Sequence, residues 1–269
     1  MPAHNCRSLE EAFGEVQSRI LKARAVSLYL NFDGTLTPLA ANPDDAHLPD
    51  PTRVALERIA GRSRMLTTIL TGRSLFDARK RTGVPGIVYA GNHGMEINGS
   101  GLMFVEPAAA ACQERLERIC ESLESKLKAV PGVRIENKRL TATLHHGQAD
   151  KEFIPVVEAA LSESVEPYAE AFRVEPARDG FDILPETTWN KASTVQLIQD
   201  FLADEDALIL YFGDHRSDEV AFEALRGGIT VKVGDPESTE AHYWVSNSAS
   251  VGDFLLWLAD AAPMTGVNG

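Results

Sequence analysis

The sequence has few cysteines and no long apolar run. Only 3 of its 269 residues are cysteines, too few for the disulfide framework of a small secreted domain. Nowhere do about 18 apolar residues follow one another, as a membrane-spanning helix requires. The N-terminal segment MPAHNCRSLEEAF turns acidic where a signal peptide is apolar. We therefore expect a cytoplasmic protein without membrane partners.

Basic residues are also in short supply. Lys and Arg together number 26, against 39 Asp and Glu, which gives a formal net charge of −13. Such a surface repels nucleic-acid phosphates and anionic lipids. The charge balance therefore argues against nucleic acid as a partner and favours a small-molecule ligand. It leaves the oligomeric state open.

Short apolar runs alternate with amphipathic segments over much of the chain. Strands are expected at 25–30, 65–70, 86–90, 207–212 and 229–233. Helices are expected at 8–24, 51–60, 74–81, 191–203 and 218–226. This alternation is typical of a parallel sheet flanked by helices. The sequence therefore predicts an α/β protein with a Rossmann-like parallel-sheet core.

The middle of the chain has another pattern. A long helix is expected at 107–130, followed by extended segments at 133–137 and 140–146, a helix at 152–162, and extended segments at 172–174 and 181–184. The order α-β-β-α-β-β favours an α+β domain inserted into the first one. We expect a core from residues 1–98 and 186–269 and an inserted domain from 99–185.

Acidic and amide side chains follow two of the predicted strands. Asn31 and Asp33 come after the first apolar run and project to the same side of an extended segment. Asp214 and Asp218 follow a later run and can share a face if the chain enters a helical turn. Ligands of open α/β sheets bind at the carboxyl ends of strands. Hard oxygen donors gathered there favour Mg²⁺ bound together with a substrate phosphate.

Two further strand-end residues suit a phosphate ligand. Thr71 opens the TGR loop after a predicted strand, and Lys191 opens a predicted helix. A hydroxyl and an ammonium at this edge would neutralise phosphoryl oxygens during transfer. Taken alone, each is more often an ordinary loop or surface residue. Their order and spacing with the acidic residues favour a site.

These motifs resemble a known family. The segments LYLNFDGTLTPL, TGR, the helix that opens at Lys191, and GDHRSDEVAF occur in the order typical of haloacid dehalogenase phosphatases. GNHGMEI and ENKRLTATLHH resemble trehalose-6-phosphate phosphatases in particular. The resemblance implies a core with an inserted cap domain, dependence on Mg²⁺, and hydrolysis of trehalose 6-phosphate to trehalose and phosphate through an aspartyl-phosphate.

The resemblance also implies roles for the strand-end residues. The residue at 31 would attack phosphorus, and Asp33 would protonate the leaving oxygen and then activate water. Thr71 would bind the phosphoryl group, and Lys191 would steady it. Mg²⁺ would be held by residue 31, the Asp33 carbonyl and Asp214, with Asp218 supporting its water shell.

Position 31 departs from the family because it holds asparagine. A neutral amide is a very poor nucleophile and removes one negative charge from the metal site, so we expect this chain to be an inactivated variant. Either a deliberate Asp→Asn change traps a substrate complex, or the chain is a natural phosphatase relative that does not turn over. Retention of the other site residues favours the first account.

The resemblance places further residues at the sugar. In the inserted domain these are Glu136, Lys138, His145 and Asp182; in the core they are Arg73, Asn92, His93 and Glu96. For His93, a loop residue that satisfies backbone groups is an equally good account. His215, Gly147 and Leu184 replace an acidic residue and two basic residues of the family pattern. The alternatives are a phosphatase of another glycosyl phosphate, such as sucrose phosphate, and a catalytically dead sugar-phosphate-binding protein.

Overall fold

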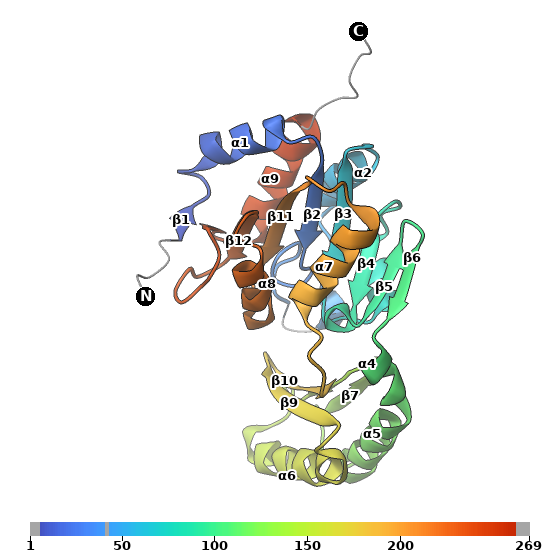
Figure 1. Cartoon of the computed structure of the whole chain (residues 1–269). Helices are drawn as coiled ribbons and strands as arrows, with labels where there is room; N and C mark the ends of the chain where they lie inside the picture. The colour runs from blue at the N-terminus through green and yellow to red at the C-terminus, as the bar shows by residue number, and fades with distance from the viewer. Residues whose placement is uncertain (1–5, 41–42, 262–269) are drawn as a thin grey trace. The chain divides into compact units, whose positions relative to one another are not determined.

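The structure is a computed structural model that describes residues 6–40 and 43–261 (Figure 1). It divides into two compact units, a core unit of Met1–Phe104 with Asn190–Gly269 and an inserted unit of Val105–Trp189. The boundaries predicted after residues 98 and 185 differ from this division, which changes units after residues 104 and 189. The first leaves the strand Leu102–Val105 outside the core, although this strand consists of apolar residues and pairs with the strand that precedes it in sequence, Glu96–Gly99.

The core unit contains one nine-stranded sheet in the order β1-β13-β12-β11-β2-β3-β4-β5-β6. Its strands are β1 (Arg7–Ser8), β2 (Val26–Leu30), β3 (Met65–Leu70), β4 (Val88–Gly91), β5 (Glu96–Gly99), β6 (Leu102–Val105), β11 (Leu208–Gly213), β12 (Ile229–Val233) and β13 (Tyr243–Val245). The pairs from β1 to β4 are parallel, and β5 is antiparallel to β4. The predicted α/β class is therefore correct, with a mixed edge.

Helices cover both faces of this sheet (Figure 1). They are α1 (Phe13–Lys22), α2 (Asp50–Ala60), α3 (Leu75–Thr82), α7 (Lys191–Leu202), α8 (Glu219–Ala224) and α9 (Ser248–Ala261), with short 3₁₀ turns η1 (Pro43–Asp45), η2 (Asn92–Gly94) and η5 (Arg216–Asp218). The helix predicted at 8–24 is shorter than expected. It begins only at Phe13, because Ser8 belongs to β1 and residues 9–12 form a turn. In β1 the Arg7 N–H donates to the His242 carbonyl at 3.0 Å.

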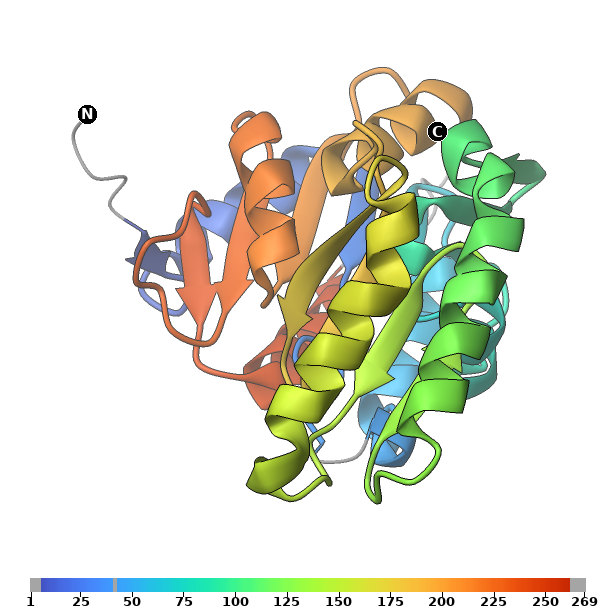
Figure 2. The same cartoon turned by 90° about the horizontal axis from the view of Figure 1, so that it is seen from below.

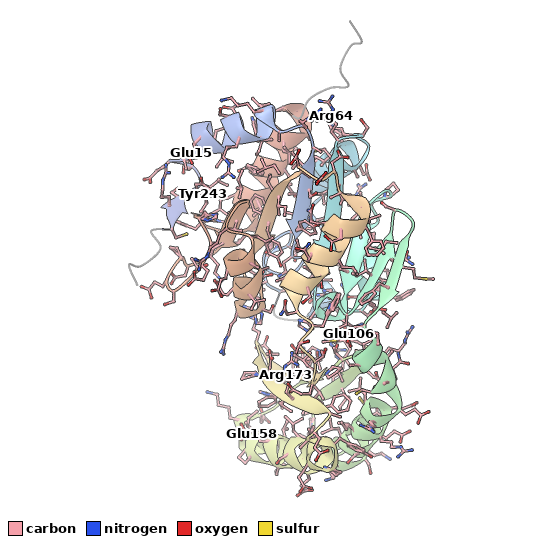
Figure 3. All side chains as sticks on the ribbon, viewed as in Figure 1. Glu15, Arg64, Glu106, Glu158, Arg173 and Tyr243 are labelled. Atoms are coloured by element: carbon pink, nitrogen blue, oxygen red, sulfur yellow. The ribbon has the colours of Figure 1, made fainter. Side chains whose placement is uncertain are left out.

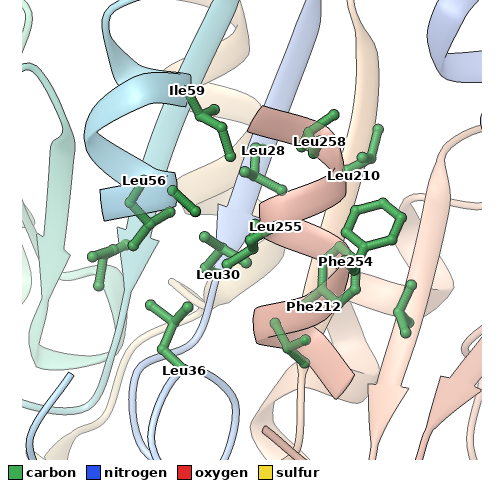
Figure 4. Packing of buried hydrophobic residues seen from close by; sticks show 14 of the residues in the cluster. Leu28, Leu30, Leu36, Leu56, Ile59, Leu210, Phe212, Phe254, Leu255 and Leu258 are labelled. Carbon is green, nitrogen blue, oxygen red and sulfur yellow. The ribbon is translucent and has the colours of Figure 1, made fainter. Parts of the chain in front are cut away.

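Alternation along β2 and β11 divides the core into two layers. Leu28, Leu30 and Phe212 point toward α2 and α9 and pack there with Leu56 and Leu255 (Figure 4). All five side chains are buried. Burial of these side chains fixes the register of the central strands, because a one-residue slip would bring the opposite set of side chains to this face.

The opposite layer contains two aromatic side chains. Tyr29 and Tyr211 stack with ring centroids 6.2 Å apart, and Phe222 of α8 meets Tyr211 edge-on at 5.6 Å. The Gln199 amide of α7 donates to the Tyr29 hydroxyl at 3.1 Å. The helices α7 and α8 are thereby fixed on the face of the sheet from which Lys191 and Asp218 reach the strand ends.

A polar contact joins the first helix to the sheet edge. The Tyr243 hydroxyl of β13 donates to Glu15 Oε1 of α1 at 3.0 Å, and both residues are labelled in Figure 3. The two residues lie near opposite ends of the chain. Their contact therefore joins the N-terminal helix to the C-terminal part of the sheet, next to β1.

The inserted unit is an α+β layer with a four-stranded antiparallel sheet in the order β7-β8-β10-β9. Its elements are α4 (Pro107–Ala111), α5 (Gln113–Leu127), β7 (Arg134–Asn137), β8 (Ala142–His145), η3 (Lys151–Phe153), α6 (Ile154–Val165), η4 (Glu166–Tyr168), β9 (Phe172–Ala177) and β10 (Gly180–Pro185). Figure 2 shows α5 and α6 side by side on one face of this sheet. The predicted hairpin and the two following strands are present.

One helix of the inserted unit differs from its prediction. The expected helix 107–130 is two helices that meet at Cys112, where ψ of −7° departs from the helical value. Glu106 caps the first of them by accepting from the Ala109 N–H at 2.5 Å. Leu116 and the apolar residues that follow it on the helix are buried as predicted, whereas Cys112 is only half-buried.

Candidate functional site

The polar residues predicted as a site lie at one edge of the core sheet. Asn31 follows β2, Thr71 follows β3, and Asp214 follows β11, and these three strands are neighbours and parallel. The backbone continues the pairing past β2, because the Asn31 N–H donates to the Phe212 carbonyl at 3.0 Å. The carboxyl ends of these strands therefore bring the residues to a common edge.

The Asn31 amide joins two of the predicted metal ligands. Its Nδ2 donates to the Asp33 carbonyl at 3.0 Å and to Asp214 Oδ1 at 2.6 Å. The Thr35 hydroxyl donates to the same Asp214 oxygen at 2.9 Å. Burial, with the nearby charge of Asp218, raises the pKa of Asp214 despite these donors. An amide with two hydrogens here balances oxygens that would otherwise repel one another.

Gly34 makes the approach of Asp214 possible. Its φ of +75° lies in the left-handed region, and a Cβ on it would sit 2.1 Å from Asp214 Oδ2. Any other residue would displace the carboxylate or the loop. The glycine of the NFDGT segment is therefore required by the packing of the site itself.

The Asp33 carboxylate is held by a fork of hydrogen bonds from Arg73. Arg73 Nε and Nη2 donate to its two oxygens at 2.7 and 2.6 Å, and Nη1 donates to Asp77 at 2.6 Å. Arg81 continues the chain by pairing with Asp77 at 2.7 Å. Arg73, predicted to bind substrate, thus orients the predicted acid–base residue in this structure. Its contact with substrate stays a prediction.

A buried ion pair connects α7 to the loop after β11. Lys191 Nζ donates to Asp218 Oδ1 at 2.6 Å, and the two side chains are 3% and 0% exposed. The Tyr211 hydroxyl donates to the same oxygen at 2.7 Å, and the His215 N–H donates to Oδ2 at 3.0 Å. Asp218, predicted to support a metal's water shell, is here the partner of the predicted phosphate-binding lysine.

The strand-end groups are chemically suited to a hard cation. Among residues 6–40 and 43–261, no three His, Cys, Asp or Glu side chains gather as metal ligands. The convergent groups are instead an amide, a backbone carbonyl and a carboxylate, at Asn31, Asp33 and Asp214. All three can present an oxygen atom once the amide turns, and such a set of oxygen ligands fits Mg²⁺. The set carries one negative charge fewer than it would with a second carboxylate at position 31.

The GNHGME segment forms a turn around buried side chains. The Asn92 amide donates to Glu96 Oε1 at 2.7 Å, and the same oxygen accepts from the Leu75 N–H at 2.9 Å. Asn92 and Glu96 are buried, and His93 is half-buried with φ of 60°. Glu96 thus binds the Asn92 amide and the α3 backbone, and contact with a sugar stays a prediction for Asn92, His93 and Glu96 alike.

The four sugar residues predicted in the inserted unit come together on its sheet. His145 Nε2 lies 2.9 Å from Glu136 Oε2, and Lys138 Nζ lies 3.8 Å from Asp182 Oδ1. The Thr143 hydroxyl donates to Asp182 at 2.5 Å, and register places Thr143 between Asp182 and Glu136. These side chains share the face opposite α5 and α6, because Leu144 and Ile183 alternate with them into the apolar cluster.

Sequence reasoning missed several residues that contact the predicted ones. They are Thr35, Asp77, Arg134, Thr143 and Tyr211. The two-residue period of the hairpin could have identified Arg134 and Thr143, because each lies on the same strand face as a predicted residue. Asp77 and Tyr211 carry no local signal, since the contacts depend on how separate elements pack.

Glu136 gives the inserted unit an acid-dependent stability. The hydrogen bond with His145, aided by the charges of Lys138 and Arg134, lowers the pKa of Glu136 from 4.5 to about 2 despite its burial. Between these values the unfolded chain binds more protons than the folded one. The stabilisation is therefore complete above pH 4.5 and is lost as the pH falls toward 2.

The variant Glu136→Gln tests this dependence. We expect a loss of roughly 1–3 kcal/mol in unfolding free energy at pH 7, after discounting for solvent screening. The loss should shrink toward pH 2.5, as measured by urea unfolding at several pH values. Glu158→Gln is the matched control, because this exposed residue lies on α6 of the same unit (Figure 3). A pH-independent loss would contradict the assignment.

Comparison with known proteins gives a consistent result. A model of the trehalose-phosphatase family matches residues 29–248. The probable trehalose-phosphate phosphatase D of Arabidopsis thaliana is 28% identical over 262 residues, 91% of this chain and 70% of that protein. The trehalose-phosphate phosphatase of Mycobacterium avium is 32% identical over 252 residues, 89% of this chain but 63% of that protein.

Solved structures share the fold. The C-terminal domain of C. albicans trehalose-6-phosphate phosphatase superposes with a TM-score of 0.80 at 20% identity, over 96% of this chain and 99% of that one. A trehalose-6-phosphate phosphatase related protein gives 0.76 at 22% identity, over 87% and 97%. In the described ranges no helix has the length and apolar character needed to cross a membrane.

Proposed function

This chain belongs to the trehalose-phosphatase family of the haloacid dehalogenase superfamily, and we propose from that premise that its site is built to bind and hydrolyse trehalose 6-phosphate with Mg²⁺. The reaction would release trehalose and phosphate. The observation that carries the proposal is the contact of Asn31 with Asp214 beside the Asp33 carbonyl. Three separate positions of the family pattern thereby form one oxygen-rich centre.

We assign each core side chain a role from its contacts. Thr71 and Lys191 bind the phosphoryl oxygens, and Asp218 holds the lysine ammonium in place. Arg73 orients the Asp33 carboxyl group, which in its protonated form donates a proton to the leaving sugar oxygen and, as the carboxylate so formed, later accepts a proton from water. Mg²⁺, held by residue 31, the Asp33 carbonyl and Asp214, would neutralise charge on the transferring group.

The inserted unit supplies hydroxyl recognition in this proposal. Its sheet presents both acceptors and donors, namely the Glu136 and Asp182 carboxylates with the Lys138 ammonium and the His145 ring. Sugar hydroxyls both donate and accept hydrogen bonds, so a mixed set of charged partners suits a disaccharide.

Asn31 separates binding from turnover. The amide cannot form the aspartyl-phosphate, so we propose that the chain binds the substrate without hydrolysing it. The same observation favours the second candidate, a sugar-phosphate-binding protein that has lost catalysis. Both candidates predict binding, and they differ in what happens when the carboxylate is restored. A preference for another glycosyl phosphate is the third possibility to test.

Titration calorimetry of the unaltered chain tests the proposed binding. With Mg²⁺ present, we expect trehalose 6-phosphate to bind with a Kd within roughly 1 μM–1 mM, where KM values usually lie. Trehalose alone and inorganic phosphate should each bind more weakly, because each reaches only part of the proposed contacts. Equal affinity for glucose 6-phosphate and sucrose 6-phosphate would remove the assignment to trehalose. No heat from any sugar phosphate would contradict the proposal.

A further inference from the structure

The turn of residues 91–96 is hydrogen-bonded to the loop that carries Thr71. The Thr71 carbonyl accepts from the His93 N–H at 2.9 Å, and the Thr71 N–H donates to the carbonyl of Ala90, the residue just before the turn, at 2.9 Å. The Asn92 N–H donates to the Arg73 carbonyl at 2.7 Å. Three backbone hydrogen bonds therefore fix the position of Thr71 and its neighbours on the strand-end edge.

The buried Glu96 side chain adds two hydrogen bonds that link the turn to α3. Its Oε1 atom accepts both from the Leu75 N–H, the first residue of α3, and from the Asn92 amide. A buried carboxylate is favourable there because the first turn of a helix has unpaired N–H groups and a positive end. It also holds Asn92, which like its neighbour His93 has a φ value unfavourable for residues other than glycine, 49° and 60° respectively.

The other side of the same turn contacts α7. The Thr194 hydroxyl donates to the Gly94 carbonyl at 3.3 Å. Gly94 has φ of +92°, and a Cβ on it would sit 2.0 Å from Thr194 Oγ1. Thr194 follows Lys191 by one helical turn, so the turn packs directly on the part of α7 that carries the lysine.

We propose that the 91–96 turn is a positioning element that sets the separation between Thr71 and Lys191, with Glu96 as its positioning residue. The chain between these two residues passes through the whole inserted unit, so covalent connection does not fix their spacing. The turn contacts both segments and spans them. The inference rests on the proposed function only in assigning phosphate binding to the two residues.

The variants Glu96→Ala and Glu96→Gln form the test. Both donors meet the same carboxylate oxygen, and glutamine keeps an oxygen there, whereas alanine removes it. In Glu96→Ala we expect amide hydrogen exchange to accelerate about tenfold or more at 71–75 and also at 191–195. In Glu96→Gln both segments should change less than about threefold. These magnitudes correspond to the loss of one or two hydrogen bonds.

The second segment is the decisive readout. Asn247→Ala is the matched control, because it removes an acceptor for the Ser250 N–H in the first turn of α9 in the same unit. It should leave exchange at both segments unchanged. Faster exchange at 71–75 alone would mean that Glu96 only caps α3, and would overturn the proposal.

Kinetics give an independent test in an Asn31→Asp background. There Glu96→Ala should lower kcat/KM about 10–100-fold, as expected for misplaced binding groups, while Glu96→Gln retains most of it. A lower unfolding temperature with unchanged kcat/KM would overturn the proposal. If Glu96→Ala fails to fold, Thr194→Val removes the hydroxyl that reaches Gly94, and its exchange at 71–75 is measured instead. An inactive Asn31→Asp chain would contradict the proposed function. The hydrogen-exchange result would still decide whether Glu96 positions the two segments.

Discussion

Replacement of Asn31 by aspartate is expected to raise Mg²⁺-dependent phosphate release from trehalose 6-phosphate on the order of 10³-fold or more. Loss of an enzyme nucleophile costs on the order of 10⁴–10⁶ in kcat, and the exchange reverses such a loss. It also replaces the amide that donates to Asp214 and to the Asp33 carbonyl with an oxygen that a cation must neutralise. Phosphate release by both chains, with Mg²⁺ and with a chelator, provides the measurement.

The matched control for this experiment is the double variant Asn31→Asp with Asp33→Asn. It restores the nucleophile but removes the proposed acid, so it should lose most of the recovered turnover. A panel of trehalose 6-phosphate, sucrose 6-phosphate and glucose 6-phosphate identifies the substrate. Release from another member alone would retain the mechanism and reject trehalose 6-phosphate. If none of the three compounds releases phosphate, a sugar-phosphate-binding protein without catalysis is favoured instead.

Removal of the Lys191 ammonium is expected to destabilise the core unit by about 3–5 kcal/mol, because breaking a buried ion pair leaves an uncompensated charge. In Lys191→Met the fully buried Asp218 keeps donors from Tyr211 and the His215 backbone but loses the Lys191 ammonium, which lies 2.6 Å from its Oδ1 atom. Urea unfolding at pH 7 measures the loss.

A surface pair provides the comparison. Lys126 Nζ lies 2.5 Å from Glu163 Oε2, but the two side chains are 34% and 67% exposed. Lys126→Met should therefore cost less than about 1 kcal/mol. In addition, Lys191→Met with Asp218→Asn should recover part of the stability, because the isolated charge is gone. Similar losses for the two lysine variants would show that the Lys191 pair is not desolvated as described.

The sequence was sufficient to predict the strands that carry local apolar runs. The strands β2, β3 and β11 are each a continuous buried or nearly buried run, and the polar residues after them mark the site edge. By contrast, β1 has only two residues, and it forms a strand because it pairs with β13 from the other end of the chain. No local pattern encodes such a pairing.

The limits at the site have a similar origin. Residue types and order predicted Asp33 and Glu96 as site residues, but they did not tell what each side chain contacts. Asp33 is held by Arg73, and Glu96 accepts from the α3 backbone, through contacts between separate loops. The hairpin residues were easier, because Glu136 and His145 lie on adjacent strands whose register follows from a short turn.

The interrupted core has a consequence for folding during synthesis. Val26 of β2 pairs with Leu208 of β11, so the centre of the large sheet lacks a neighbour until most of the chain has left the ribosome. The inserted unit, in contrast, is continuous in sequence and has its own apolar cluster. We therefore expect the inserted unit to fold first. Until then the first half of the core forms at most an incomplete sheet, whose exposed edge is prone to aggregation.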